Sequence, residues 1–167
     1  NLSGKICHTS TKEGIEKIKN AKAKKINVLT EVSPHHLFFD EGLLTAQNQN
    51  WMQMNPPLRT KEDREYLIEA LREGAIDFIA TDHAPHTEEE KLKGTSGTPQ
   101  LDTYGLFTTW LMEKHNFTPE QIVRVCSYNP GKFINDFTAN KYGKIEEGYT
   151  GSLTIIDKNK PKKITQN

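Results

Sequence analysis

Phe78-Ile79-Ala80-Thr81-Asp82-His83-Ala84-Pro85-His86 places three ionisable side chains directly after a short apolar run. The run is typical of a buried strand, and Pro85 prevents a helix from starting directly after it. We therefore expect Asp82, His83 and His86 on a fixed turn at the carboxyl end of this strand, where functional loops commonly lie. A carboxylate and two imidazoles beside a rigid proline favour a functional site over a solvated junction between strand and loop.

Predicted strands and helices alternate on both sides of this segment. Alternation of this kind implies parallel strands joined by right-handed crossovers, which is the α/β class. The polar residues His8, His35, His36, Asn55 and Asp82 each follow a strand, at the face where a parallel barrel builds its active site. The expected elements are strands over residues 4–9, 27–32 and 77–81, a short third strand-like segment ending at 54–57, and helices over residues 10–25 and 61–73.

Capping signals set the expected ends of the helices. Ser10 and Glu13 form a capping-box pattern at the start of the first helix, whose lysines we expect on a solvated outer face. Thr60 should cap the helix over residues 61–73, and Gly74 should end it.

The carboxyl-terminal part of the chain changes character. Helices are expected over residues 102–114 and 118–128, with a short final helix from Pro130. Glycine turns and a β-branched run then predict a hairpin over residues 143–157. We therefore divide the chain into residues 1–140 and residues 141–167, and we expect the second part to belong to a separate small β-domain.

Bulk composition excludes several classes of partner. The chain has 22 basic and 22 acidic residues, so no net field favours nucleic acid or an anionic membrane. No apolar run approaches the roughly 20 residues of a membrane helix, and no signal peptide opens the chain, so we expect a soluble cytosolic protein. Cys7 and Cys126 form no metal or redox motif and are expected as small hydrophobic residues in a buried strand and a helix.

The hydrophobic content, 34%, is low for a self-contained globule of 167 residues. The strand near residues 2–8 has no earlier element to pair with, and a polar tail from Lys158 follows the last strand. We therefore expect the chain to be a fragment that lacks part of its core.

His8 and Asp82 are the residues we expect to bind a metal ion. Imidazole nitrogens and a carboxylate from separate strand ends are typical ligands of a catalytic zinc ion, which lowers the pKa of its bound water from about 16 toward 7. Asp82 could then be both a ligand and the group that carries a proton to the leaving group. Adjacent His35 and His36 cannot both face one site, and packing is favoured for them over metal binding. Asn55, before two prolines, suits the amide edge of a substrate.

Four blocks of sequence together resemble the dihydroorotases of the bacterial or archaeal type, within the amidohydrolase superfamily. The blocks occur in the right order, and the similarity extends from Gly4 to about Asp157. They are residues 7–13 (CHTSTKE), 30–37 (TEVSPHHL), 54–59 (MNPPLR) and 80–91 (ATDHAPHTEEEK). The chain would correspond to the carboxyl-terminal portion of such an enzyme, with strands 6 to 8 of a TIM-like (β/α)8 barrel and the start of a β-sandwich domain.

The resemblance implies a zinc-dependent, reversible interconversion of L-dihydroorotate and N-carbamoyl-L-aspartate in pyrimidine biosynthesis, with one or two zinc ions. His8 matches the zinc-ligand histidine after the sixth strand, and Asp82 matches the aspartate that contacts the metal and moves the proton. Asn55 and His86 match substrate-binding positions, and His83 would support the site. Ser96 and Gly97 match the loop whose backbone meets the pyrimidine ring, although this loop departs from the family's Pro-Gly pattern and has Gln100 where glycine is common.

The family's other metal ligands, including a His-x-His motif, have no counterpart in this chain, so we expect the isolated chain to be inactive. Two alternatives remain open: an allantoinase or hydantoinase of the same superfamily, and a non-catalytic dihydroorotase-like subunit that scaffolds aspartate carbamoyltransferase. A homo-oligomer is also compatible with the resemblance. The expected substrate is a small molecule in every catalytic case.

Overall fold

A parallel three-stranded sheet organises the fold in the computed structural model, which describes residues 3–160. The strands lie in the order β1 (Ser3–Ile6), β2 (Asn27–Val32) and β3 (Phe78–Ile79). In the register, Ser3 lies opposite Asn27 and Val32 lies opposite Ile79. The three carboxyl ends therefore point the same way, as the alternating sequence pattern predicts.

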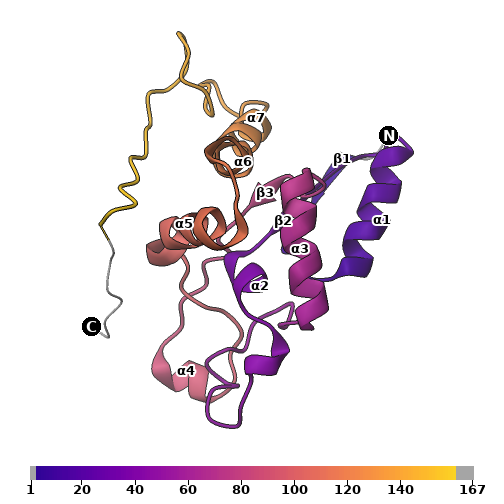
Figure 1. The fold of residues 1–167 in the computed structure, drawn as a ribbon, viewed down its shortest axis with the longest axis vertical. Coiled ribbons are helices and arrows are strands. Elements are labelled where there is room, and N and C mark those ends of the chain that lie inside the picture. Colours follow the sequence, from indigo (N-terminus) through magenta and orange to yellow (C-terminus); the bar gives the residue numbers. More distant parts are fainter. Residues whose placement is uncertain (1–2, 161–167) are drawn as a thin grey trace.

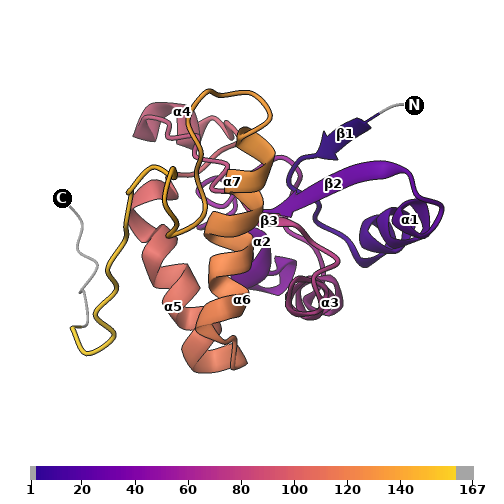
Figure 2. The same cartoon turned by 90° about the horizontal axis from the view of Figure 1, so that it is seen from above.

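Helices α1 (Lys12–Ala23) and α3 (Lys61–Glu73) lie on the same side of the strands (Figure 2). Ile15 and Ile18 of α1 and Leu67 and Leu71 of α3 are buried in one apolar core with Val32 of β2. Thr60 accepts a hydrogen bond from Asp63 N, and Gly74 ends α3 in the left-handed conformation, as expected. The predicted bounds of β2 and α3 are confirmed.

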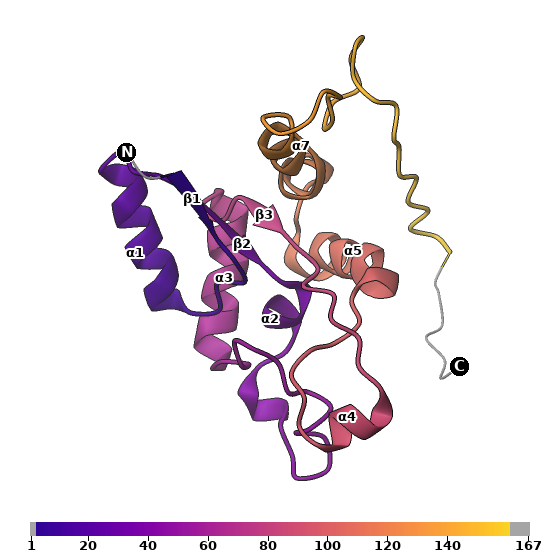
Figure 3. The ribbon, with the colours of Figure 1, turned by 180° about the vertical axis from the view of Figure 1, so that it is seen from behind.

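Shorter helices and loops follow each strand end. Figure 1 shows α2 beyond β2, and α4 among the long loops at the end of the molecule away from the N-terminus. In Figure 3 residues 144–160 run apart from the sheet. The remaining elements are α2 (Pro34–Phe38), 3-10 turns Glu41–Leu43 and Leu101–Thr103, α4 (Glu88–Leu92), α5 (Tyr104–His115), α6 (Pro119–Val123), a π-helical stretch Arg124–Tyr128 and α7 (Asn129–Ile134).

Several local predictions are wrong. Thr11, not Ser10, caps α1, because the buried Ser10 hydroxyl accepts from Arg59 Nε instead. Cys7 is exposed rather than buried. The strand expected over 77–81 is limited to the two residues of β3, which pair with Glu31 and Val32 of β2. The strand expected over residues 4–9 is shorter and ends at Ile6. The strand-like segment expected before residue 54 is not formed.

Other corrections concern the first helix and the end of the chain. Lys19 and Lys22 are not simply solvated, because they bond Tyr66 and Asp77. Residues 143–160 contain no strand, so the predicted hairpin is not formed; Ile145 and Ile155 are 91% and 94% exposed and have no surface to pack on. Residues 161–167 of the expected β-domain lie outside the described residues. Within residues 3–160, no helix is long and apolar enough to cross a membrane.

Candidate active site at the carboxyl ends of the strands

His8 and Asp82 share an uncommon backbone conformation. Their φ angles are 35° and 49°, in the left-handed region that residues other than glycine seldom adopt. Each residue lies shortly after the end of its strand, β1 for His8 and β3 for Asp82. Strained backbone of this kind persists only where contacts with the surrounding structure stabilise it, and it is frequent at functional sites. Lys25 and Asn116, which follow helices α1 and α5, also have positive φ angles, so this conformation supports the choice of His8 and Asp82 only together with their side-chain chemistry.

His35 and His36 lie in α2, which directly follows the middle strand, and both rings contact the Ser33 hydroxyl, so the expectation that they point to opposite sides of an extended segment is wrong. His35 Nε2 lies 3.9 Å from Asp82 Oδ2, and both imidazoles are almost fully buried. Burial, followed by the neighbouring His36 and His8, lowers the pKa of His35 to about 3. Burial also lowers the pKa of His36, whose surroundings include the charges of His8 and Asp82. His8, His35, His36 and Asp82 therefore lie near one another where the strands end, and both buried rings are neutral near pH 7.

A directed hydrogen-bond chain runs through the two buried histidines. His36 Nε2 lies 3.0 Å from the Pro56 carbonyl, which can only accept, so this nitrogen carries the proton. His36 Nδ1 then accepts from the Ser33 hydroxyl at 2.6 Å. The Ser33 oxygen in turn accepts from His35 Nε2 at 2.9 Å. The Pro56 carbonyl therefore determines the tautomers of both rings, and the chain links the loop after Asn55 to the histidine beside Asp82.

This tautomer leaves His35 Nδ1 as an acceptor. That atom is buried and has no hydrogen-bond partner among residues 3–160. A buried acceptor without a donor is costly, and such a group in a folded protein usually has a functional explanation or an additional partner. The sequence favoured packing over metal binding for His35, and its distance to Asp82 could not be predicted from neighbouring residue types.

The donor set fits part of a zinc site. His8 offers an imidazole nitrogen, and Asp82, whose side chain is 34% exposed, offers carboxylate oxygens. Among the described residues, no group of three or more histidine, cysteine, aspartate or glutamate side chains could hold a metal ion. A catalytic zinc ion needs about three protein ligands, so these two residues would require ligands from elsewhere.

The expected substrate-binding residues lie on two loops that touch. Gly97 N donates to Gln53 O at 3.0 Å, and Gln53 Nε2 lies 3.4 Å from Ser96 Oγ. Asn55, two residues beyond Gln53, is exposed. The structure therefore brings the Asn55 loop beside Ser96 and Gly97, which are more than 40 residues away in the chain.

Gly97 also fits closely against the segment that holds His86. Its φ is 134°, and a Cβ there would lie 2.6 Å from Ala84 O and 2.9 Å from His86 Cδ2. Only glycine allows this approach. His86 Nδ1 lies 3.5 Å from Glu90 Oε2 in the capping box of α4. The exposed His83 holds the same turn, because its Nδ1 accepts from Gln100 N at 3.0 Å.

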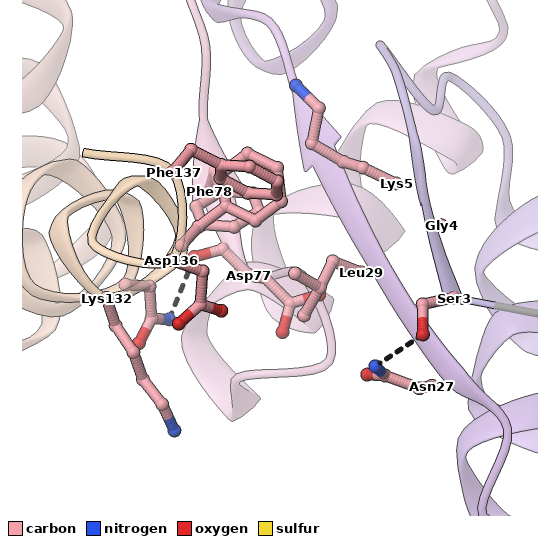
Figure 4. A pocket seen from close by; sticks show the side chains of 12 residues that line it. Ser3, Gly4, Lys5, Asn27, Leu29, Asp77, Phe78, Lys132, Asp136 and Phe137 are labelled. Carbon is pink, nitrogen blue, oxygen red and sulfur yellow. Dashed lines mark hydrogen bonds between the residues drawn. The ribbon is translucent and has the colours of Figure 1, made fainter.

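A pocket of about 620 Å³ lies at the other end of the strands. Ser3 and Asn27, which are hydrogen-bonded to each other, and Asp77 and Phe78 line it together with residues of α7 (Figure 4). These residues belong to the amino-terminal parts of the strands, whereas His8 and Asp82 follow the carboxyl ends. This pocket is therefore not the space into which the candidate site residues would project.

Comparison with known proteins identifies similar sequences and folds. Residues 4–167 match the profile of the Amidohydrolase family. The dihydroorotase of Halalkalibacterium halodurans is 44% identical over 157 residues, covering 91% of this chain and 36% of that protein. The dihydroorotase of Listeria monocytogenes serotype 4b (strain F2365) is 40% identical over 164 residues, covering 95% of the chain and 37% of that protein. The chain thus spans slightly more than a third of the length of these curated relatives.

Solved structures with the same fold carry other names. A D-hydantoinase (dihydropyrimidinase) from Thermus sp. superposes with a TM-score of 0.80 at 26% identity, covering 90% of this chain and 34% of that one. The dihydropyrimidinase of Brevibacillus agri NCHU1002 also gives a TM-score of 0.80, at 23% identity with the same coverage, which supports the fold alone.

Proposed function

The chain belongs to the amidohydrolase family, and we propose that it forms the carboxyl-terminal part of a dihydroorotase, a cyclic amidohydrolase. One observation carries the proposal. His8, His35 and Asp82, from the ends of three adjacent parallel strands, lie near one another in a chain that is 44% identical to a dihydroorotase over 91% of its length. The residues at the strand ends support the proposal that the protein hydrolyses an amide. The sequence similarity supports the proposal that the substrate is dihydroorotate.

The proposed reaction is the reversible opening of L-dihydroorotate to N-carbamoyl-L-aspartate. Water adds to the ring carbonyl carbon, and the bond between this carbon and the ring nitrogen breaks. Asp82 takes a proton from the attacking water and delivers it to the leaving nitrogen. A zinc ion held by His8, Asp82 and ligands from outside this chain would supply Lewis acidity. In the reverse direction, Asp82 removes the proton from the nitrogen that closes the ring.

The other site residues would bind and orient the substrate. His86 would contact the substrate carboxylate, and the amide of Asn55 can both donate to and accept from the ring. Ser96 and Gly97 would meet the pyrimidine ring through their backbone. Two contacts support this common role in substrate binding. Gly97 N donates to Gln53 O, and the backbone of Gly97 packs against the segment that contains His86.

We also propose that β1, β2 and β3 are strands 6 to 8 of a (β/α)8 barrel that ends near residue 140, with residues 141–167 belonging to a β-sandwich domain. The parallel order of the strands and their intervening helices support the barrel. The sequence similarity, which extends to about Asp157, supports the second domain. Pyrimidine biosynthesis would place the enzyme in the cytoplasm. Homo-oligomers or a complex with aspartate carbamoyltransferase remain the candidate assemblies.

A hydantoinase is the second candidate, because structures bearing that name share the fold at a TM-score of 0.80. The two functions differ in the substrate, since dihydroorotate carries a carboxylate that hydantoin and allantoin lack. A site built to bind such a group rejects analogues without it strongly. The complete protein should therefore hydrolyse dihydroorotate with a kcat/KM about 100-fold or more above the values for hydantoin and allantoin. Faster turnover of hydantoin would favour the second candidate.

A further inference from the structure

Lys91 of α4 occupies an environment that lysine seldom adopts. It is 5% exposed, although the helix around it is rich in exposed acidic residues. Among the ion pairs of residues 3–160, none joins Lys91 to a carboxylate. Burial lowers the pKa of its ammonium group. A buried ammonium without a counter-ion is costly unless hydrogen bonds satisfy it, so the partners of Nζ need to be identified.

All partners of the Lys91 ammonium are backbone carbonyls. Nζ lies 3.0 Å from Gln53 O, 2.8 Å from Thr95 O and 2.9 Å from Gly97 O. An ammonium has three N–H donors and no acceptor, so the number of donors equals the number of carbonyls. A neutral amine would have only two donors and would leave one of these carbonyls without its partner. The geometry therefore matches the charged form.

The three carbonyls belong to the two loops that are expected to bind substrate. Gln53 precedes Asn55 by two residues, while Thr95 and Gly97 flank Ser96. Gln53 O also accepts from Gly97 N at 3.0 Å, so both of its lone pairs are used. One ammonium group thus joins two loops that are more than 40 residues apart in the chain.

We infer that Lys91 is a positioning residue that fixes the Asn55 loop against the Ser96–Gly97 loop and thereby determines substrate affinity. The inference rests on the proposed function of these loops. Lys91 itself need not touch the substrate, because all three of its donors are engaged by carbonyls. Asp82 lies outside this network, so the proton-transfer step should be largely preserved when the network is broken.

Lys91→Met in the complete protein tests this inference, because methionine keeps the apolar length and removes the three donors. Thr95 O and Gly97 O then lose the Nζ donor, and the loop that contains Ser96 loosens. We expect KM for dihydroorotate to rise about tenfold or more while kcat stays within about threefold. A KM increase without a kcat loss indicates lost binding rather than lost chemistry.

Lys93→Met is the matched control. Lys93 is exposed, and its Nζ pairs with Glu89 at 2.6 Å, so this variant removes the same charge two residues away without touching the loops. Its kinetic constants should equal those of the unmodified protein. Circular dichroism of both variants separates a loop effect from a folding defect.

Lys91→Arg provides a second variant if Lys91→Met does not fold. Its planar guanidinium keeps the charge but cannot direct three N–H groups from one nitrogen at three carbonyls, so KM should rise here as well. A KM within twofold of the Lys93→Met value in a folded Lys91 variant overturns the inference, and so does a loss confined to kcat. If the unmodified protein hydrolyses hydantoin and not dihydroorotate, the proposed function fails, and the same KM comparison is made with hydantoin.

Discussion

For single residues of this site, the sequence predicts the type of side chain and its place after a strand. It does not predict the backbone conformation. The sequence identifies His8 and Asp82 by side-chain type and by their place after strands. Their positive φ angles depend on where the strands direct the chain, and no local pattern indicates them. The same holds for His35, whose pairing with Ser33 and distance to Asp82 arise only in the folded chain.

The strain at His8 leads to a prediction about stability. Glycine adopts positive φ without steric cost, whereas alanine does not. We expect His8→Gly in the complete protein to have a free energy of unfolding about 1 kcal/mol higher than His8→Ala, measured by urea denaturation. Both variants lack the imidazole and should lose zinc equally, so metal loss cancels in the comparison. A more stable alanine variant would argue against strain at this position.

Cys126 provides a pH-dependent prediction. Burial raises the pKa of its thiol from the ordinary value of 9.0 to about 11, and Tyr104 lies beside it. Only the thiolate is alkylated, so the rate at pH 8 should be roughly 100-fold below that of a thiol with the unshifted pKa. The rate should still increase about tenfold per pH unit up to pH 10. Peptide mapping after iodoacetamide treatment measures it, and a plateau near pH 9 would contradict the raised pKa.

Elements with strong local signals follow the sequence closely. The bounds of α3 are determined by the Thr60 cap, the apolar spacing of Leu67 and Leu71, and Gly74, all of which lie in or next to the helix. By contrast, β3 is short because its length depends on pairing with β2, and residues 143–157 form no hairpin because they lack a packing surface. Ser10 and Thr11 show the same limit, since Arg59, distant in sequence, engages Ser10. Sequence therefore predicts what neighbouring residues determine and misses what distant contacts determine.

The cap of α3 can be tested alone. Thr60 Oγ1 accepts from Asp63 N at 3.1 Å, and alanine removes this acceptor. We expect Thr60→Ala to lower the free energy of unfolding by about 1 kcal/mol, while Thr60→Ser, which keeps the hydroxyl, stays within a few tenths. Urea denaturation of the three proteins measures the difference. Equal losses for serine and alanine would show that the methyl group, not the cap, matters.

At the scale of the whole molecule, we propose that the active site is divided, with further metal ligands outside this chain. His8, His35 and Asp82 come together, yet residues 3–160 do not supply three metal-binding side chains at one place. The chain also covers only 36% of a dihydroorotase relative, and its residues 3–160 form a sheet of three strands. The sequence leads to the same expectation, because this chain has no counterpart of the family's His-x-His motif, and this expectation stays a prediction. The sequence could not predict how the two loops that are expected to bind substrate meet, because the Lys91 contacts include Gln53, which is distant in the chain.

The divided site predicts the behaviour of the isolated chain. Two ligands are too few for tight zinc binding. The 167-residue chain, produced alone, should retain less than one zinc ion after dialysis and should not cyclise N-carbamoyl-L-aspartate. Metal analysis and a cyclisation assay check this. Measurable turnover by the isolated chain would show that it holds a complete site.

The role of Asp82 in the complete protein tests the account most directly. The measurement is kcat/KM for dihydroorotate hydrolysis by Asp82→Asn, compared with the unmodified protein at equal zinc content. Asparagine keeps the size of the side chain but cannot shuttle the proton. The account predicts a loss of about 1,000-fold or more. A loss of less than tenfold at equal zinc content would contradict it.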